Sequence, residues 1–429
     1  MRKQSLKSIY KLSKKNNKIV FIGSDLGSGI LNEMKEKYPN RFFMEGVSEQ
    51  HILGMAAGLA MDGFIPFVNT ISTFFYRRAL DQIIIDLCLH DLPVRLIANG
   101  GGLVYAPLGP THIAFEDISI LRPIPNLGIF TPADAIEMQN LIKNLEVWPH
   151  PAYIRLGKGG DPTLISKIKT SFQIGRPRIL KESKKNLILS CGIMSGICQD
   201  ALKNVSNDHD IGHIHFHTIK PLDKKYLKRI LKGVENIITF EENTLTGGFG
   251  SMILEFLNEN LPDQNTRIKR FGLGDVFPKH YGSQATHLNY WGLSSVLIYK
   301  KIMGFSPKIA LLGLNPHCES VDKFNEDIKV IKPSIKYLSK NKINIKGPYS
   351  ADTAFLKKNR INFHVIVGMY HDQVLTPLKT LYEYDAINIT LGLPFLRISP
   401  DHGPNEKMLG QNKSNPLSLI RAIEFLEKN

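Results

Sequence analysis

Two separate groups of residues in this sequence have side chains that could do chemistry. The upstream group holds Glu49 and His51 at the start of a stretch of small residues, then Phe74, and then His112 in a Gly-Pro-Thr-His run. Carboxylates and imidazoles are the side chains that most often transfer protons in enzymes. A lone glutamate at a helix start is usually solvated and is favoured there by the helix dipole. Only the group as a whole therefore indicates a site.

The downstream group is unrelated to the first. It consists of Asn315-Pro316-His317, Met369-Tyr370-His371-Asp372-Gln373 and the run from Asn388 to Phe395. Between the two groups lies Gly304-Phe305-Ser306-Pro307, which we interpret as a seam. Each group looks like part of a catalytic apparatus and lacks the rest of it. The sequence therefore predicts two incomplete enzymes joined end to end.

The composition fits an ordinary soluble globular protein. The chain has 429 residues, of which 43% are hydrophobic and 22% charged, and this length suggests about three domains. No apolar run approaches the roughly 20 residues of a membrane helix, and no signal-peptide core follows the basic N-terminal stretch. The four cysteines show no zinc or disulfide spacing. We expect a cytoplasmic protein without membrane contact.

The net charge of +15 raises the question of nucleic-acid binding. Seven of the basic residues lie in residues 1–18, which contain no acidic residue, and the others are dispersed. No RNA-binding signature, zinc finger or basic zipper accompanies them. We interpret the charge as solvated helix faces whose field attracts phosphorylated substrates. We expect small phosphorylated substrates and no nucleic acid.

Strand-like apolar runs alternate with helical periods, which is the pattern of α/β layers. Residues 158–185 are rich in Gly, Pro and Lys, which suggests a linker. The expected strands are 18–23, 64–69, 94–98, 186–190, 211–219, 236–240, 308–312 and 363–367. The expected helices include 48–61, 74–89 and 325–339.

The upstream motifs agree in order and spacing with those of a known family. They are Gly46–His51, Ser72-Thr73-Phe74, Gly109–His112, Tyr153–Gly157, Lys220–Asp223, Glu241-Glu242-Asn243 and Tyr281–Gln284. From about Lys18 to Met303 the chain resembles the C-terminal half of transketolase, and it is similar also to 1-deoxyxylulose-5-phosphate synthase. The resemblance implies an α/β fold. It implies a thiamine-diphosphate pyrimidine-binding domain over residues 1–160, a linker over 161–185 and a transketolase C-terminal domain over 186–305.

The same resemblance implies roles for individual side chains. Glu49 matches the catalytic glutamate that hydrogen-bonds the aminopyrimidine ring of thiamine diphosphate and so promotes loss of the thiazolium proton. Phe74, with Phe75 as the alternative, matches the aromatic residue that stacks on that ring. His112 matches a catalytic histidine that meets the substrate. Arg155 matches an arginine that binds a sugar phosphate.

Two departures from the family limit what the chain is expected to do alone. The family often has an acidic residue before Gly-Pro-Thr-His to grip a substrate hydroxyl, whereas this chain has Leu108. The G-D-G…N-N element that holds metal and diphosphate is absent, and in the family it belongs to the other half, often a separate subunit. We therefore expect thiamine diphosphate to be shared with a transketolase N-terminal-half subunit that holds most of the magnesium. A homodimer or heterotetramer is expected.

A run of three alternating histidines offers a competing interpretation. Alternation would place His213, His215 and His217 on one face of a strand, as in a zinc triplet. The run precedes Lys220-Pro221-Leu222-Asp223, where the family has a plain sheet strand. We favour the structural interpretation and keep the zinc site as the alternative.

From Pro307 onward the residues resemble the C-terminal part of 4-hydroxythreonine-4-phosphate dehydrogenase, an enzyme of pyridoxal phosphate synthesis. The matching runs are Leu311–His317, Gly347–Thr353, Met369–Gln373, Asn388–Arg397 and Asp401-His402-Gly403. The resemblance implies that His317 and His371 are divalent-metal ligands, with NAD as hydride acceptor. It implies that Lys379, Asn388 and Arg397 hold the phosphorylated substrate. The implied fold is a partial α/β/α lobe of the isocitrate/isopropylmalate-dehydrogenase kind over residues 306–429.

This dehydrogenase-like part is also incomplete. The family's third histidine and a His-Thr pair lie upstream of Asn-Pro-His, where this chain has transketolase-like sequence. His287 lies too close to His317 to replace that ligand, Cys318-Glu319-Ser320 replaces the usual Gly-rich run, and no G-x-G-x-x-G is present. We expect strand 308–312 to leave an unpaired edge and an exposed apolar face. Residues 307–429 would then form a separate, less stable lobe, while residues 18–303 keep a dimerising core.

Three hypotheses follow for the function. The leading one is a gene fusion whose first two thirds form a transketolase-type transferase subunit, incomplete alone, that moves a two-carbon ketol unit between phosphorylated sugars. The second is a metal- and NAD-dependent oxidoreductase similar to 4-hydroxythreonine-4-phosphate dehydrogenase. The third is a non-catalytic fusion remnant whose parts only fold and associate.

Overall fold

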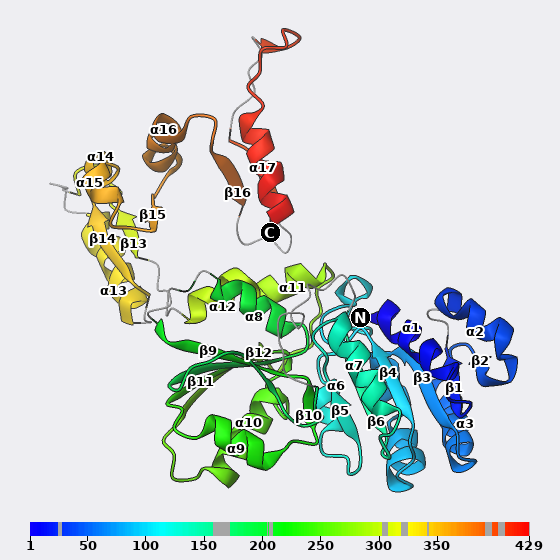
Figure 1. Ribbon diagram of the computed structural model, residues 1–429. Helices are drawn as coiled ribbons and strands as arrows, with labels where there is room; N and C mark the ends of the chain where they lie inside the picture. Colours follow the sequence, from blue (N-terminus) through cyan, green and yellow to red (C-terminus); the bar gives the residue numbers. More distant parts are fainter. Residues whose placement is uncertain are drawn as a thin grey trace. The chain divides into compact units, whose positions relative to one another are not determined.

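The computed structural model describes residues 1–24, 28–157, 172–203, 205, 209–302, 308–318, 325–340, 343–390, 397–401 and 408–428. These residues belong to two compact units, Met1–Met303 and Gly304–Asn429, each with its own sheets (Figure 1). The seam at 304–307, most of the expected linker, and the motif residues 391–395 and 402–403 lie outside the described residues. The predicted α/β class is confirmed.

A seven-stranded sheet forms the first part of unit 1, in the order β10-β5-β6-β4-β3-β1-β2. Every neighbouring pair is parallel except β10 with β5. Strands β1, β4, β5 and β6 are buried along their whole length, as parallel strands covered on both faces should be. The strands are β1 (Ile19–Gly23), β2 (Phe42–Met44), β3 (Ile65–Ile71), β4 (Arg95–Asn99), β5 (Gly128–Phe130), β6 (Ala152–Leu156) and β10 (Thr218–Lys220).

Helices cover both faces of this sheet because alternate strand residues face opposite clusters. On β1, Val20 and Ile22 pack with α3, α4 and η3, whereas Ile19 and Phe21 pack with α1 and α7. The helices are α1 (Arg2–Ser13), η1 (Ser28–Leu31), α2 (Asn32–Lys37), η2 (Pro39–Arg41), α3 (Glu49–Met61), α4 (Ser72–Arg78), α5 (Leu80–Gln82), η3 (Ile83–Leu89), η4 (Ala106–Leu108), α6 (Asp117–Leu121) and α7 (Ala135–Leu145).

The helix expected over 74–89 differs from the observed one in a way that matters for the site. It begins earlier, at Ser72, and is interrupted at Ala79, where φ is −129°. Helix α4 therefore ends at Arg78, and Phe74 lies in its first turn rather than at its start. Apolar residues at helical spacing, Leu80, Ile83 and Leu87, continue through α5 and η3, which is why the sequence pattern did not reveal the break.

The second part of unit 1 is a five-stranded sheet in the order β12-β11-β8-β9-β7. Helices α8, α11 and α12 lie on one face and α9 and α10 on the other (Figure 1). The strands are β7 (Arg178–Lys181), β8 (Asn186–Cys191), β9 (Ile211–Phe216), β11 (Asn236–Thr244) and β12 (Arg267–Leu273). The helices are α8 (Met194–Leu202), α9 (Lys224–Leu231), α10 (Phe249–Asn260), α11 (Gln284–Tyr290) and α12 (Ser295–Ile302).

Strand β10 connects the two sheets of unit 1. The predicted single strand 211–219 is in fact two strands: β9 lies in the second sheet and β10 pairs with β5 in the first. The Thr131 amide donates to the His217 carbonyl at 2.8 Å, and the Thr131 hydroxyl donates to the Phe216 carbonyl at 2.8 Å. One buried apolar cluster also extends from Val20 to Leu257 across both sheets. The two halves therefore form one packed body.

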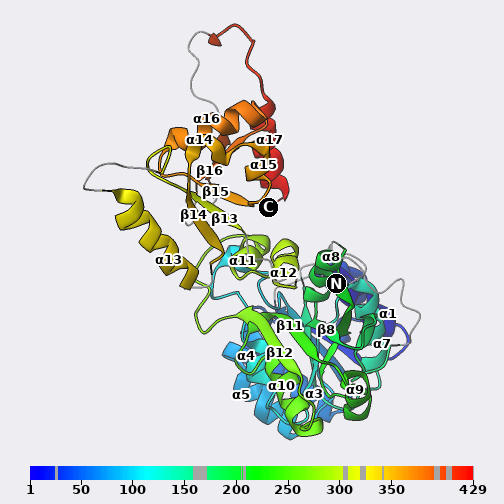
Figure 2. The same cartoon turned by 90° about the vertical axis from the view of Figure 1, so that its left-hand side faces the viewer.

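Unit 2 contains a three-stranded parallel sheet in the order β14-β13-β15 and a β16-β17 hairpin (Figure 2). Its described apolar cluster has three buried members, Leu311, Ile331 and Ile345. The strands are β13 (Ile309–Leu312), β14 (Ile345–Tyr349), β15 (Val365–Val367), β16 (Ile387–Thr390) and β17 (Arg397–Pro400). The helices are η7 (Asp327–Ile331), α13 (Lys332–Lys340), α14 (Ala351–Ala354), α15 (Lys357–Arg360), α16 (His371–Tyr382) and α17 (Leu417–Lys428).

The prediction that strand 308–312 leaves an unpaired edge is wrong. Strands β14 and β15, both from later sequence, pair with β13 on its two sides. Exposed apolar side chains occur instead on β15, where Val365 and Val367 are 43% and 37% exposed. In the described part of the chain, no helix is both long enough and apolar enough to cross a bilayer.

Candidate active site

Glu49 opens helix α3 next to the carboxyl ends of β1 and β3. Its side chain is only 3% exposed. The Thr70 hydroxyl, near the end of β3, donates to Glu49 Oε1 at 3.3 Å, and the Ser24 hydroxyl donates to Thr70 Oγ1 at 2.9 Å. Arg78 Nη1 donates to Glu49 Oε2 at 3.1 Å. Ligand sites of parallel α/β sheets lie at this edge.

Phe74 and His112 meet close to this carboxylate. Their ring centroids are 5.3 Å apart with an interplanar angle of 66°, and the Phe74 ring also contacts Arg78, the partner of Glu49. Phe74 is partly exposed, whereas Phe75 is fully buried in the core. Of the two aromatic candidates, Phe74 is therefore the one open to a ligand.

The electrostatic surroundings keep His112 neutral more readily than a free imidazole. Partial burial lowers its pKa, and the charges of Arg78 and Arg77 lower it further. A neutral imidazole near pH 7 can accept a proton. This suits a histidine that meets the substrate, the role predicted for His112.

Arg77 fixes the loop that carries His112. Its guanidinium donates to the carbonyls of Pro110 (3.1 Å), Thr111 (3.2 Å) and Ile113 (3.0 Å), and it pairs with Glu116 Oε1 at 2.6 Å. Arg77 lies outside the sequence motifs described above. Its only sequence signal is a pair of arginines at the end of α4, and such a pair also suits any helix C-terminus.

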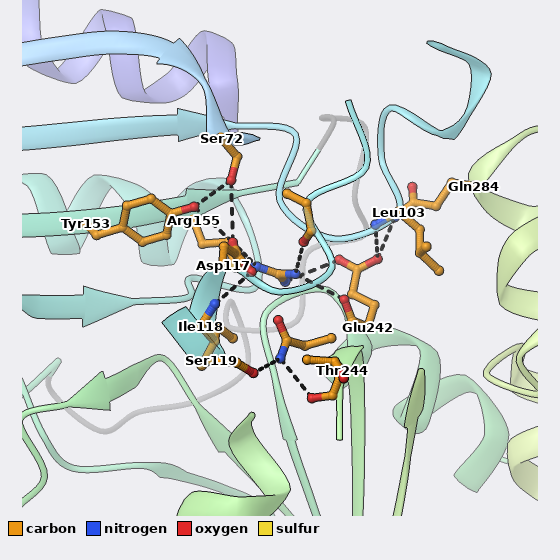
Figure 3. A network of polar contacts seen from close by, with 12 residues as sticks. Ser72, Leu103, Asp117, Ile118, Ser119, Tyr153, Arg155, Glu242, Thr244 and Gln284 are labelled. Atoms are coloured by element: carbon orange, nitrogen blue, oxygen red, sulfur yellow. Dashed lines mark hydrogen bonds and ion pairs between the residues drawn. The ribbon is translucent and has the colours of Figure 1, made fainter. Parts of the chain in front are cut away.

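Arg155 lies in a buried network that joins the two halves of unit 1 (Figure 3). It comes from β6 and is 5% exposed; its Nε donates to Asp117 Oδ2 at 2.8 Å and its Nη1 lies 3.5 Å from Glu242 Oε1. The Tyr153 hydroxyl donates to the same Asp117 oxygen at 2.9 Å, and Ser72 hydrogen-bonds Tyr153. The phosphate-binding role of Arg155 stays a prediction, because its described partners are protein carboxylates and carbonyls.

Charge compensation holds this network together. Burial raises the pKa of Glu242 to about 7, against the opposing effect of the Arg155 charge. Burial alone would lower the pKa of Arg155, but the charges of Asp117 and Glu242 outweigh it and raise that pKa. Gln284 and the Leu103 amide also donate to Glu242 Oε2, at 3.1 and 3.2 Å.

The three alternating histidines do not converge on one point. His213 hydrogen-bonds Ser190 at 2.7 Å, and His217 hydrogen-bonds Thr218 at 2.8 Å. His215 lies between Ser195 and Glu137, at 2.6 and 2.7 Å. Among the described residues, no group of three or more His, Cys, Asp or Glu side chains could hold a metal ion. The structural interpretation of this run is the one that these contacts support.

Acidification is expected to destabilise unit 1 through these histidines. Burial lowers the pKa of His213 to about 3 and that of His217 to about 4. Below pH 6.5 the unfolded chain therefore binds more protons at these two histidines than the folded chain does. The free energy of unfolding falls as the pH drops from 6.5 towards 4, by about 2 kcal/mol per histidine at pH 5. Melting temperatures from pH 7.5 to 5 should fall less steeply for His213→Asn than for the wild-type chain. The exposed His209→Asn should keep the wild-type slope, and equal slopes for all three would contradict the prediction.

In unit 2 the two predicted metal ligands each pair with an aspartate. His317 Nδ1 lies 3.4 Å from Asp352 Oδ2, and His371, the first residue of α16, lies 2.7 Å from Asp372 Oδ1. Both aspartates line one open cleft of about 560 Å³. Gln373 holds the two loops together by donating to the Gly313 carbonyl at 2.7 Å.

The residues predicted to hold the phosphorylated substrate of unit 2 lie on three elements. Lys379 is on α16, Asn388 on β16 and Arg397 on β17. Asn388 pairs with Ser399 across the hairpin, and Arg397 Nη1 lies 3.4 Å from the Thr390 hydroxyl. The described contacts therefore place Asn388 and Arg397 on one hairpin, and their substrate role stays a prediction.

Comparison with known proteins yields three family matches along the chain. Residues 1–160 match the transketolase pyrimidine-binding domain, residues 175–298 the transketolase C-terminal domain, and residues 296–426 the pyridoxal phosphate biosynthetic protein PdxA. The order is the one predicted from the sequence.

Curated relatives and solved structures agree with the first two matches. The 1-deoxy-D-xylulose-5-phosphate synthase of Syntrophus aciditrophicus is 36% identical over 289 residues, which are 67% of this chain and 44% of that protein. That of Halothermothrix orenii is 36% identical over 276 residues, or 64% and 43%. The chain thus spans less than half the length of these relatives. Transketolase from Leishmania mexicana shares the fold, with a TM-score of 0.55 at 17% identity over 71% of this chain and 45% of the other.

One solved structure is matched over nearly its whole length. It is described as a split gene transketolase in an inactive beta4 tetramer. It is 30% identical with a TM-score of 0.64, and the match covers 71% of this chain and 97% of that one. The chain therefore belongs to the transketolase family, as a pyrimidine-binding domain and a transketolase C-terminal domain, and it carries a PdxA domain at its C-terminus.

Proposed function

We propose that unit 1 is a transketolase-type subunit that transfers a two-carbon ketol unit between phosphorylated sugars with thiamine diphosphate. The observation that carries the proposal is the meeting of Glu49, Phe74 and His112 at one edge of the first sheet. The second half of the cofactor site, for metal and diphosphate, comes from a separate chain. The split gene transketolase is a precedent for a family member built from separate chains.

The residues present fit the aminopyrimidine half of the cofactor. Glu49 offers a buried carboxylate, and Phe74 offers a partly exposed ring beside it. When bound, thiamine diphosphate supplies the carbon nucleophile that ketol transfer requires. Glu49 holds a proton at the pyrimidine ring nitrogen, and Phe74 orients that ring. His112, with its lowered pKa, accepts a proton from a substrate hydroxyl.

Reconstitution tests the proposal. The full chain is mixed with candidate subunits that carry the G-D-G…N-N element, together with thiamine diphosphate and magnesium. Ketol transfer between phosphorylated sugars is expected from the mixture and not from the chain alone. If no such subunit restores thiamine-dependent turnover, the proposal is wrong.

We further propose that the chain that completes the site lies against α3. Gly54, Gly58 and Met61 share one face of this helix, the space above both glycines is open, and Met61 is 59% exposed. The neighbouring η3 adds the exposed Ile85 and Leu89. Glu49 begins the same helix, so a chain packed along this face would lie within one helix length, about 20 Å, of the cofactor site.

Replacing Gly58 with glutamate is expected to weaken binding of the completing chain about 100-fold without unfolding the protein. Glutamate is a better helix former than glycine, but an unpaired carboxylate in an interface costs several kcal/mol, or about two orders of magnitude in affinity. Sedimentation velocity of the wild-type chain, Gly58→Glu and the distant control Val147→Glu checks this. If Gly58→Glu sedimented with the partner in the same way as the wild-type chain does, the proposed surface would be wrong.

We propose a second function for unit 2 because the aspartate partners of both histidines line one cleft. It would be a metal- and NAD-dependent dehydrogenase of phosphorylated hydroxy acids. Formation of NADH from 4-phosphohydroxythreonine with a divalent metal is the test, and its absence leaves unit 2 as a non-catalytic fusion partner. Ligand-dependent rises in melting temperature would separate binding from mere folding.

A further inference from the structure

Arg78 makes two contacts with the candidate cofactor site at once. Its guanidinium carbon lies 3.9 Å from the centroid of the Phe74 ring. Its Nη1 donates to Glu49 Oε2 at 3.1 Å, and Glu49 Oε1 is held by Thr70. A flat N–H-bearing group therefore lies on the aromatic ring and also hydrogen-bonds the buried carboxylate.

These are the two contacts that the aminopyrimidine of the cofactor would make. A guanidinium is planar, stacks on aromatic faces and donates to carboxylates. An aminopyrimidine is also planar, and its ring nitrogen side and amino group are polar. Arg78 and a bound pyrimidine would therefore compete for the same aromatic ring and the same carboxylate.

We propose that Arg78 is a built-in occupant of the pyrimidine half-site, which the cofactor must displace before it binds. The proposal rests on the proposed function of Glu49 and Phe74. In the free chain Arg78 compensates the charge of a carboxylate that is almost fully buried. By occupying the half-site, Arg78 also lowers the apparent affinity of the chain for the cofactor.

Helix α4 is built so that this side chain can leave while the helix stays in place. The adjacent Arg77 is anchored by three loop carbonyls and Glu116. Arg78, at the last position of the helix, is 48% exposed, and Glu49 is its one polar partner among the described contacts. Rotation of Arg78 away from Glu49 breaks one half-exposed ion pair and one cation–π contact, and both are weak when solvent can replace them.

A direct binding measurement tests this occupancy. The probe is the neutral pyrimidine 4-amino-5-hydroxymethyl-2-methylpyrimidine, which carries no charge for Arg78 to repel. Isothermal titration calorimetry on the full chain is expected to give about tenfold tighter pyrimidine binding to Arg78→Ala than to the wild type. If Arg78 occupies the site about 90% of the time, only about one molecule in ten is open, and the apparent affinity falls by that factor. Arg78→Lys, which keeps the charge but loses the planar group, should fall between the two. Arg229→Gln, a surface arginine on α9, should match the wild type.

A competition experiment with methylguanidinium provides a second readout. In Arg78→Ala it should refill the vacated place and weaken pyrimidine binding, whereas in the wild type it should have no effect. Equal pyrimidine affinity for wild type and Arg78→Ala, with binding lost in Glu49→Gln, would overturn the occupancy while leaving the proposed function intact. Absence of pyrimidine binding in all variants that keep the wild-type melting temperature would overturn the occupancy, whereas the reconstitution experiment decides the proposed function.

Discussion

Glu49→Gln is expected to lower thiamine-dependent turnover of the reconstituted complex by about 10²- to 10⁴-fold, the usual effect of losing a positioned proton-transfer group. Glutamine keeps the size of the side chain and can still accept from the Thr70 hydroxyl at its oxygen. It cannot exchange a proton with the pyrimidine ring. The measurement is the rate of ketol transfer at saturating cofactor, so that a change in binding does not hide the change in chemistry.

The matched control is Glu255→Gln. Glu255 also pairs with an arginine, Arg122, but it lies on α10 and is largely exposed. This variant should turn over like the wild type. If Glu49→Gln and Glu255→Gln had the same rate, Glu49 would be an ordinary buried carboxylate and the proposed cofactor chemistry would be wrong.

Arg155→Met is expected to destabilise unit 1 by about 3–5 kcal/mol, because removing one member of a buried ionic network leaves its partners uncompensated. Asp117 is fully buried and Glu242 nearly so, and neither can recover water without opening the boundary between the two sheets. Denaturant-induced unfolding followed by circular dichroism measures the loss. The more exposed pair Arg176–Asp223 supplies the control, since Arg176→Met should leave the unfolding free energy close to that of the wild type.

The same variant separates two roles for Arg155. Replacing a residue that only binds a sugar phosphate would raise the KM of the phosphorylated substrate and leave the unfolding free energy unchanged. Replacing a residue that ties the two sheets together would instead lower the free energy of unfolding. Wild-type stability of Arg155→Met would therefore contradict the structural role and favour the phosphate-binding role.

Glu49, Phe74 and His112 could be selected as site candidates from the sequence because each residue lies in a motif of its own. The partners of Arg155 could not be, because Asp117 lies 38 residues before it and Glu242 lies 87 residues after it. No local period connects such positions.

The two arginines of α4 show a second limit of sequence reasoning. They are adjacent in sequence, yet Arg77 holds the loop of His112 and Arg78 holds Glu49. Adjacent positions of a helix are separated by about 100°, so the two side chains point to different partners. In unit 2, likewise, β13 was expected at an edge and is central, because strands from later sequence supplied both neighbours.

The position of β10 has a consequence for how such a gene can be recombined. This strand belongs by sequence to the transketolase C-terminal domain, yet it forms the edge of the pyrimidine-domain sheet beside Phe130. A crossover between the two transketolase segments would strip that edge and cut through a shared apolar cluster, so neither product would inherit a complete core. A crossover after α12 removes no strand from either sheet of unit 1. Foreign coding sequence can therefore be appended after residue 302 without removing a strand of the upstream fold, and the match to PdxA begins close by, at residue 296.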